Sequence, residues 1–470
     1  MNFASLEFAY FLIIGFGLYA LIRRHEVQNV LLLAGSYYFY ACWDARFLLL
    51  IWVITGASFI AGRAVGQTED HSKRLRYIAI YTVFALTILG YFKYFNFFID
   101  SAQTALQALG FKVNQTYLNI VLPPAISFYI FESLSYVIEI HQRHMPATTK
   151  LRHYALFIAY FPKLVAGPIE RPAVLIPQLE KPRTITADFF TRGCFLILLG
   201  LFKKIVVADG MSPTVDSVFN SVETPNAGAI ILGTYAFALQ IYCDFSGYTD
   251  IARGVSKLFG IELSQNFRFP YFSSNPSEFW RRWHMSLSSW LRDYLYIPLG
   301  GNRVGAFRTK VNLMITMLLG GLWHGAAWNY ILWGAYQGAL LIVNDFIKPP
   351  LLKGWMAVVG RVLATVVFFH FVCYGWLLFR AKSLEQIQAF TAELLMGSQA
   401  YAATVARPPL ATLLGVVVLC LYDFAAYRSG RATFYRAWPI PVRAGLYATL
   451  VFLTLMGMAN ARSAFIYFQF

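Results

Sequence analysis

Apolar stretches of about 20 residues recur along the whole chain, and no other feature restricts its fold as strongly. A helix of about 20 residues spans the hydrocarbon core of a bilayer, which is about 30 Å thick. Hydrophobic residues make up 58% of the 470-residue chain and charged residues 13%. A typical soluble domain has about a quarter charged residues. The sequence therefore predicts an all-α polytopic membrane protein.

Prolines interrupt two of the apolar stretches, at Pro123-Pro124 and between Pro162 and Pro168. A broken helix inside a membrane needs neighbouring protein to satisfy its free backbone groups, so such segments usually line cavities. We expect about eleven stretches to cross the bilayer fully, with re-entrant and interfacial helices beside them. Hydropathy places the spans at residues 5–22, 27–43, 47–65, 77–98, 119–140, 154–169, 188–208, 227–247, 311–333, 333–347, 357–379, 409–427 and 441–459.

The basic residues indicate membrane topology rather than nucleic-acid binding. The net charge is +16, but lysine and arginine fall in short clusters between apolar runs, as the positive-inside rule predicts for cytoplasmic loops. The residues before the first run include neither lysine nor arginine, so we expect the N-terminus outside. Membrane lipids are then expected partners, and nucleic acid is not. The clusters are Arg23 and Arg24; Lys73, Arg74 and Arg76; and Arg143, Lys150 and Arg152.

Between residues 248 and 310 the sequence becomes aromatic and basic, and too polar to face lipid. We interpret residues 1–470 as one integral-membrane domain, with this segment as a cytoplasm-side interfacial or re-entrant insert. Asn275 can cap a helix there, with Pro276 as its first residue and Glu278 as the partner of a capping box. One interfacial helix should follow, because apolar residues recur at helical spacing. They are Phe279, Trp280, Trp283, Leu287, Trp290, Leu291 and Tyr294.

Several carboxylates lie within or beside apolar sequence. Asp244 and Asp250 flank Gly247, where we expect the preceding helix to break. We favour helix capping or pairing with a nearby arginine such as Arg253 over proton handling in a transporter or orientation of a donor. The other two, seven residues apart, share a helical face, and we favour hydrogen bonding between helices for them. The four are Asp244, Asp250, Glu132 and Glu139.

His324 is the only histidine or charged residue between Lys310 and Asp345, in sequence that otherwise reads as membrane interior. Ionisable groups there are costly and tend to be functional. Gly321 and Gly325 would let helices or a ligand approach closely, which leaves room for a narrow channel. Burial keeps an imidazole neutral and able to take a proton from an attacking hydroxyl. The alternative is a histidine that only hydrogen-bonds between helices.

His284 is the histidine of the insert, and it lies four residues after Trp280 and three before Leu287. On a helix it would therefore lie beside the apolar stripe and could face inward. The alternative is an interfacial histidine that anchors the helix. We predict no metal site, because the chain has neither an HExxH-type spacing nor a cysteine near these histidines.

Two histidine motifs together resemble those of a known family. Residues 279–287, FWRRWHMSL, are followed after about forty residues by GLWHG at 321–325. This pair is similar to the two-histidine signature of membrane-bound O-acyltransferases. Further segments resemble the branch that contains alginate O-acetyltransferases: residues 167–172, 244–250, Asn266-Phe267, Pro270-Tyr271 and 465–470.

The resemblance implies a fold in which a central tunnel joins a cytosolic donor to an acceptor on the other side of a bacterial inner membrane. His324 would be the principal catalytic residue, and His284 would assist or position. The donor implied is acetyl-CoA, a substrate rather than a bound cofactor, and a periplasmic acetyltransferase partner would pass the acetyl group on. Arginines of the insert could meet the donor phosphates, although ordinary topology and lipid contact explain any single one as well. Candidate substrate contacts are Trp280, Arg281, Arg282, Trp283 and Trp323.

The resemblance therefore implies an O-acetyltransferase acting on an exported bacterial polysaccharide, with alginate as the leading candidate. Peptidoglycan and cellulose are alternative polymers, and a D-alanyl transferase for teichoic acid is a further relative. An ion-coupled transporter or flippase is an alternative of another class, since it would also combine broken helices with buried carboxylates. A scaffold that recruits a soluble acetylase is a third, and it predicts that both histidines are dispensable.

Overall fold

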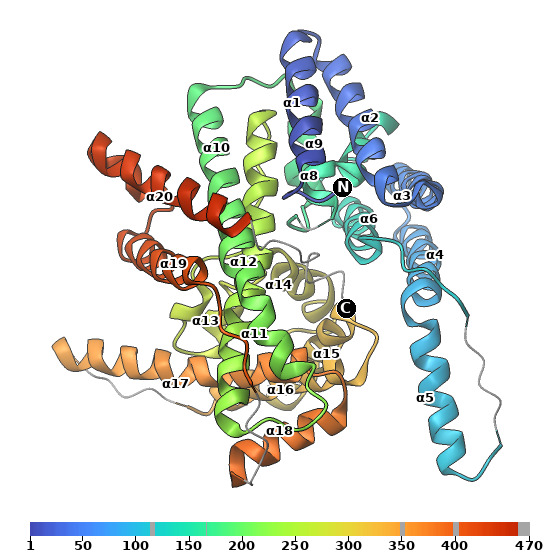
Figure 1. The fold of residues 1–470 in the computed structure, drawn as a ribbon. Helices are drawn as coiled ribbons and strands as arrows, with labels where there is room; N and C mark the ends of the chain where they lie inside the picture. Colours follow the sequence, from blue (N-terminus) through green and yellow to red (C-terminus); the bar gives the residue numbers. More distant parts are fainter. Residues whose placement is uncertain (113–117, 166, 348–352, 398–403, 459–470) are drawn as a thin grey trace. The chain divides into compact units, whose positions relative to one another are not determined.

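The computed structural model describes residues 1–112, 118–165, 167–347, 353–397 and 404–458, and in these ranges every regular element is helical (Figure 1). The chain forms two compact units. The first comprises Met1–Phe195 and Ala252–Ser264, and the second comprises Leu196–Ile251 and Gln265–Phe470. The all-helical architecture confirms the predicted fold class.

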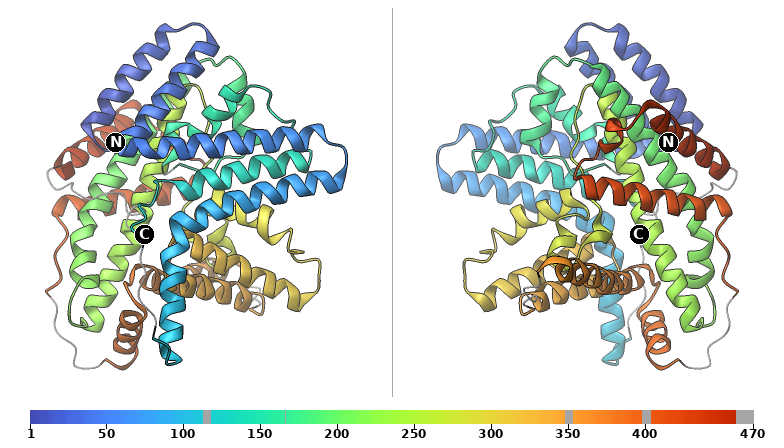
Figure 2. Two further views of the ribbon diagram at one scale, coloured as in Figure 1. Left: turned by 90° about the vertical axis from the view of Figure 1, so that its right-hand side faces the viewer. Right: turned by 90° about the vertical axis from the view of Figure 1, so that its left-hand side faces the viewer.

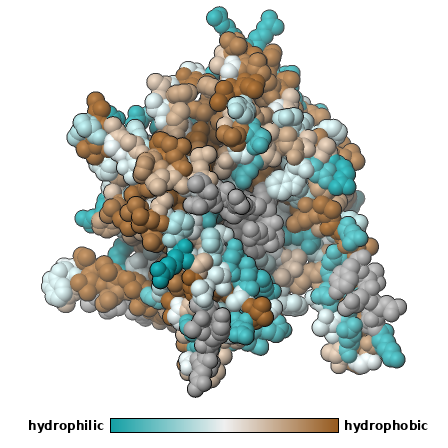
Figure 3. Space-filling view, in the orientation of Figure 1, coloured by the Kyte–Doolittle hydropathy of each residue, from teal (hydrophilic) through white to brown (hydrophobic). Residues whose placement is uncertain are grey.

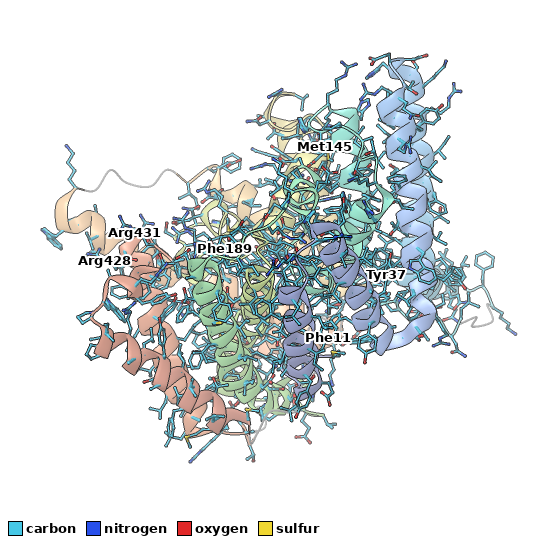
Figure 4. The ribbon with its side chains drawn as sticks, turned by 90° about the horizontal axis from the view of Figure 1, so that it is seen from above. Phe11, Tyr37, Met145, Phe189, Arg428 and Arg431 are labelled. Carbon is cyan, nitrogen blue, oxygen red and sulfur yellow. The ribbon has the colours of Figure 1, made fainter. Side chains whose placement is uncertain are left out.

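The first unit is built around α6, whose residues are nearly all buried. Helices α3, α4 and α6 lie side by side (Figure 2), and Phe11 extends from α1 and Tyr37 from α2 (Figure 4). The elements are α1 (Leu6–Leu21), α2 (His25–Asp44), η1 (Ala45–Phe47), α3 (Leu48–Gln67), α4 (His71–Leu89), η2 (Gly90–Tyr94), α5 (Phe95–Ala108), α6 (Ile126–His141), α7 (Leu151–Ala159), α8 (Phe161–Leu164), α9 (Pro172–Glu180) and most of α10 (Ala187–Leu201).

The carboxylates of α6 hold this unit together. Glu132 forms a buried ion pair with Lys163 and accepts a hydrogen bond from the Glu170 backbone N–H at 3.1 Å. Glu139 accepts one from the Ala173 N–H at 3.1 Å. Both side chains therefore satisfy the backbone beyond the proline-interrupted segment, and the predicted role in hydrogen bonding between elements is confirmed.

The second unit contains a pair of helices, α15 and α16, that cross at very short distance. A Cβ atom added to Gly321 would lie 2.2 Å from the Tyr330 carbonyl oxygen, and one added to Gly334 would lie 2.4 Å from that of Met317. Glycine is therefore required at the crossing. The elements are η3 (Phe202–Ala208), α11 (Asp209–Phe219), most of α12 (Ala227–Leu258), η4 (Pro270–Phe272), α13 (Pro276–Trp280), α14 (Met285–Leu291), η5 (Arg292–Tyr296), α15 (Ala306–His324), α16 (Trp328–Asn344), α17 (Gly354–Arg380), α18 (Leu384–Met396), α19 (Leu410–Ser429), η6 (Phe434–Ala437) and α20 (Ile440–Met458).

The outward faces of several helices are apolar, as contact with lipid requires. On α1 the exposed residues include Leu6 and Ile13, and on α17 they include Trp355 and Val358; Figure 3 shows brown, hydrophobic atoms over both helices. Within the described ranges, six continuous helical stretches are long and apolar enough to cross a membrane, which confirms a multi-pass protein. The number of about eleven crossings stays a prediction. The six are His25–Gln67, His71–Ala108, Ala227–Leu258, Gly354–Arg380, Leu410–Ser429 and Ile440–Met458.

Proline and glycine shorten three of the predicted spans. The span predicted at 119–140 becomes helical only at Ile126, after Pro123-Pro124, and the one at 154–169 is helical no further than Leu164. The span predicted at 311–333 is two helices, because the chain is extended at Gly325 and turns into α16. Proline lacks the N–H that a helix interior needs, which explains the first case directly.

The helix break predicted at Gly247 is wrong, because α12 continues through this residue to Leu258. A Cβ atom on Gly247 would lie 2.8 Å from the Gly200 carbonyl oxygen. Gly247 therefore serves close packing of α12 against the end of α10 rather than a change of chain direction. The insert predicted at 248–310 consequently loses its first eleven residues to the helix and begins at Phe259.

Ion pairs gather the predicted basic loops at one end of the first unit. Arg143 contacts Glu69 at 2.7 Å, which joins the loop after α6 to the α3–α4 loop. Lys150 contacts Glu26 at 2.9 Å, which joins the start of α7 to the start of α2. The three clusters therefore share one side of the bundle, as a common aqueous compartment for these loops requires.

Candidate active site

His284 occupies a tight turn rather than the middle of a helix. Its backbone has φ 42° and ψ 54°, and it stands between the end of α13 at Trp280 and the start of α14 at Met285. The prediction of one continuous helix is wrong, because a left-handed residue interrupts the helical hydrogen bonding. Left-handed backbone at a non-glycine residue is strained, and such strain tends to occur at functional sites.

The predicted helix cap is present in a modified form. The Asn275 side chain accepts a hydrogen bond from the Glu278 N–H at 2.8 Å, which confirms Asn275 as the N-cap of α13. The Glu278 carboxylate reaches past Asn275 and accepts from the Ser274 N–H at 2.9 Å. The start of α13 is thus held from both sides, although not by the reciprocal bond of a capping box.

Asn266 holds the chain on both sides of the left-handed turn. Its carbonyl oxygen accepts a hydrogen bond from the Met285 N–H at 2.9 Å, and its side-chain oxygen accepts from the Ser286 N–H at 3.2 Å. Two residues further on, the Arg268 N–H donates to the Arg282 carbonyl at 2.9 Å. These bonds fix the backbone around His284 and so set the direction of its imidazole.

The two motif histidines lie side by side inside the second unit. His324 is the last residue of α15, and its ring centroid lies 6.3 Å from that of His284. His284 is fully buried at 0% exposure, and His324 is 6% exposed. Side chains that are forty residues apart in the sequence therefore form one centre.

Aromatic rings from four helices surround the two imidazoles. Phe245 of α12 packs edge-on against His284 at 4.7 Å between centroids. Trp333 of α16 and Phe379 of α17 pack against His324 at 5.2 and 5.4 Å, and Trp323 of α15 contacts both histidines. These rings shield the two imidazoles from water. A passage to it from either aqueous side stays a prediction.

Burial determines the protonation state of His284. Desolvation lowers the pKa of this imidazole to about 3, because the charged form loses its hydration. Among the residues that the structure describes, neither ring nitrogen of His284 has a hydrogen-bond partner. A neutral imidazole has one donor and one acceptor nitrogen, so His284 is equipped to bind a polar group of a ligand. Within the described ranges no three His, Cys, Asp or Glu side chains gather as a metal site.

Comparison with known proteins decides which family this centre belongs to. The sequence profile described as "MBOAT, membrane-bound O-acyltransferase family" matches residues 36–385, a range that includes both histidines. The chain belongs to the membrane-bound O-acyltransferase family. It is therefore a membrane-bound acyltransferase, and the alternatives of a transporter and a scaffold are disfavoured.

Individual members of the O-acyltransferase family are similar over most of the chain. The "Probable alginate O-acetylase AlgI" of Azotobacter vinelandii is 42% identical over 82% of this chain and 76% of its own length. The protein of the same name from Pseudomonas putida is 39% identical over 100% of both chains. The "Peptidoglycan O-acetyltransferase" of Helicobacter pylori is 32% identical over 80% of this chain and 76% of its own.

The other predicted contact residues of this O-acyltransferase are distributed unevenly around the histidines. Trp323 lies against both imidazoles, and Trp283 is buried beside His284 with Trp376 at 4.7 Å. Trp280 is half-buried at the end of α13. Arg281 is exposed, and Arg282 forms an ion pair with Glu278 at 2.7 Å. The motif similar to alginate O-acetyltransferases at 465–470 lies outside the described residues.

Sequence reasoning missed four residues around the two histidines. Phe245 and Asn266 belong to segments that resemble the family, but no local pattern ties either residue to a histidine. Trp333 and Phe379 lie within apolar helices, where an aromatic residue carries no distinguishing signal. The distance of these four residues from the histidines depends on how the helices pack. Covariation between pairs of positions is a signal that could have found such contacts.

A buried cluster of ion pairs lies next to the centre in the same unit. Lys204 contacts Asp209 at 2.7 Å and Asp244 at 2.6 Å, and Asp244 directly precedes Phe245. On the following turns, Lys203 contacts Asp250 at 2.7 Å. Asp244 and Asp250 therefore pair with the lysines of η3, and the predicted pairing with Arg253 stays a prediction.

Proposed function

We propose that this acyltransferase moves acetyl groups from cytosolic acetyl-CoA toward the O-acetylation of an exported bacterial polysaccharide, with alginate as the first candidate. One observation carries the proposal: a relative named as an alginate O-acetylase is 39% identical over the full length of both chains. Identity that extends over every span argues for a shared reaction rather than a shared fold alone.

In the proposed reaction His324 acts as general base. The imidazole takes the proton from an acceptor hydroxyl while the hydroxyl oxygen forms a bond to the carbonyl carbon of the acetyl thioester. The carbon–sulfur bond then breaks, and the proton passes from His324 to the leaving thiolate. Acetyl-CoA is a substrate in this scheme, and the protein needs no bound cofactor. His284, neutral and 6.3 Å away, positions the reacting groups.

We infer that the gathered basic loops of the first unit lie in the cytoplasm and that the N-terminus lies outside. The positive-inside rule supports this orientation in the bacterial inner membrane, because Arg143, Lys150 and their neighbours share one side. Acetyl-CoA is a large anion confined to the cytosol, whereas the polymer is outside. A periplasmic acetyltransferase partner that transfers the acetyl group to the polymer fits this separation of donor and acceptor.

Peptidoglycan is the second candidate polymer. The Helicobacter pylori relative is named as a peptidoglycan O-acetyltransferase and is 32% identical. The lower identity places this polymer behind alginate, and cellulose has no comparable support among these relatives.

The proposal is tested in the cell that carries the gene. We expect deletion to remove O-acetyl esters from one surface glycan, wild-type protein to restore them, and His324→Ala to fail while it inserts at wild-type amount. The loss should be at least about a hundredfold, as for removal of a general base. Compositional analysis of alginate and of peptidoglycan, run in parallel, distinguishes the two polymers. Full acetylation by a folded His324→Ala protein would refute the catalytic assignment.

A further inference from the structure

A polar cavity of about 560 Å³ opens at the end of the first unit where α3 and α6 end and α4 begins. Its wall includes Arg63 from α3, Arg74 from α4, and Arg143 and His144 from the loop after α6. Glu69 is the acidic residue in this wall. Three arginines against one carboxylate make the cavity positive, and a positive hollow concentrates anions.

Arg74 is a buried residue of the cavity wall, and its side chain is held in place by hydrogen bonds. The residue is only 6% exposed, and its Nη2 donates hydrogen bonds to the carbonyls of Ile140 and His141 at 2.9 and 2.8 Å. These bonds close the C-terminal end of α6. Its buried Nε has no partner among the described residues. An arginine held rigid by two carbonyls with an N–H to spare is suited to bind an anion.

Arg143 occupies a left-handed backbone position after α6 that glycine adopts more easily. The His144 N–H donates to the Glu139 carbonyl at 3.0 Å, and the Arg143 N–H donates to that of Ile140 at 3.1 Å. This pattern ends α6 with Arg143 in the left-handed conformation, φ 61°, a position that usually holds glycine. Its ion pair with Glu69 joins two side chains that are 68% and 88% exposed, so the pair stabilises little. Stability does not account for an arginine here.

The cavity lies at the common end of helices that are apolar enough to cross a membrane. Met145, labelled in Figure 4, belongs to the loop that forms one wall. Lipid headgroups occupy this depth, immediately beyond the hydrocarbon core. We propose that this cavity binds the phosphate of an anionic phospholipid headgroup through Arg63, Arg74 and Arg143. Basic pockets between membrane-spanning helices are suited to such headgroups.

The test uses the full-length protein in a neutral detergent, with native mass spectrometry and thermal unfolding as readouts. Phosphatidylglycerol is added as the anionic probe and phosphatidylcholine as the neutral one. We expect bound phosphatidylglycerol to persist where phosphatidylcholine dissociates, and the unfolding temperature to rise with the anionic lipid only. Losing one charge-assisted contact should weaken phosphatidylglycerol binding about tenfold in Arg143→Gly and in Arg63→Gln.

Arg143→Gly is the decisive variant, because glycine relieves the left-handed backbone while it removes the charge. It should unfold at or above the wild-type temperature in lipid-free detergent and yet lose the lipid-dependent rise. Arg46→Gln is the matched control, since Arg46 is an exposed arginine at the opposite end of α3. Unchanged phosphatidylglycerol binding in both cavity variants overturns the proposal. An equal rise with inorganic phosphate alone also overturns it, because the site would then take a soluble anion.

Discussion

At the scale of single residues, the site depends on imidazoles that are kept from water. His284 has no exposed surface, and aromatic rings enclose His324 on two sides. Polar groups in such surroundings gain from any hydrogen bond that a substrate supplies, because the competing bond to water is absent. In the proposed reaction, the chemistry therefore depends on a few buried N–H groups and ring nitrogens.

Trp333 is one of the residues that should matter. Its indole N–H has no partner among the described residues, and its ring packs against His324 at 5.2 Å. Trp333→Phe keeps an aromatic ring and removes the donor, so we expect about tenfold slower acetyl transfer at wild-type protein amount. Trp328→Phe, an exposed position at the start of the same helix, is the control. Labelled acetyl transfer in membranes measures both; equal rates would exclude a role for the donor.

The lowered pKa of His284 makes a prediction about acid stability. The imidazole titrates near pH 6.5 in the unfolded chain and near 3 in the folded protein. Below about pH 6.5 the unfolded state binds a proton that the folded state does not, so falling pH reduces the free energy of unfolding. At about pH 5 the loss from this residue is about 2 kcal/mol.

His284→Gln removes the titrating group, so its unfolding temperature should fall less between about pH 7.5 and about pH 5 than that of wild type. Thermal unfolding in detergent at both pH values measures the difference. His71→Gln, at an exposed position, should keep the wild-type acid sensitivity. The burial argument fails if His284→Gln and wild type lose stability in parallel.

At the scale of elements, glycine decides how close the helices come. The α15–α16 crossing places backbone against backbone at Gly321 and Gly334, and His324 follows Gly321 by less than one turn. A side chain at the crossing would therefore displace the histidine as well as the helix. Packing and site geometry are coupled here.

Gly321→Ala should consequently lower both stability and activity. Its Cβ would meet the Tyr330 carbonyl oxygen at 2.2 Å, and backbone cannot rotate away as a side chain can. Overpacking of this kind costs about 1–3 kcal/mol. Gly15→Ala in α1 is the matched control, because no atom lies within 4 Å of its added Cβ. Fluorescence-detected size exclusion after heating compares the two; equal tolerance would contradict the crossing.

At the scale of the whole molecule, buried charge must be neutralised within each unit. Glu132 with Lys163 does this in the first unit, and Lys204 with Asp209 and Asp244 does it in the second. Such pairs are expensive to desolvate, and they become a liability when one partner is removed. They make each unit sensitive to single substitutions at residues other than the histidines.

Lys204→Met tests this sensitivity. It leaves Asp209 and Asp244 without their lysine, and breaking a buried pair costs about 3–5 kcal/mol. We expect a large fall in membrane-inserted protein and in unfolding temperature. Lys181→Met, an exposed lysine after α9, should be neutral. Wild-type stability of Lys204→Met would show that the cluster is not a determinant of folding.

The sequence by itself determined the membrane character, the helical class and the family motifs. Long apolar helices such as α17, α19 and α20 end within a few residues of their predicted limits, because hydropathy over about 20 residues is a local property. The cap at Asn275 was also readable, since it depends on neighbours three residues apart. The basic loops were found for the same reason.

The tertiary structure alone decided what surrounds those motifs. The left-handed turn at His284 is held by Asn266 from another segment, and Gly247 lies inside a helix that packs closely against Gly200. The partners of Asp244 and the rings around His324 likewise come from helices distant in the sequence. Hydropathy and helix capping depend on residues that are close in the sequence. Packing distances, buried charge pairs and ring contacts depend on which helices pack against each other.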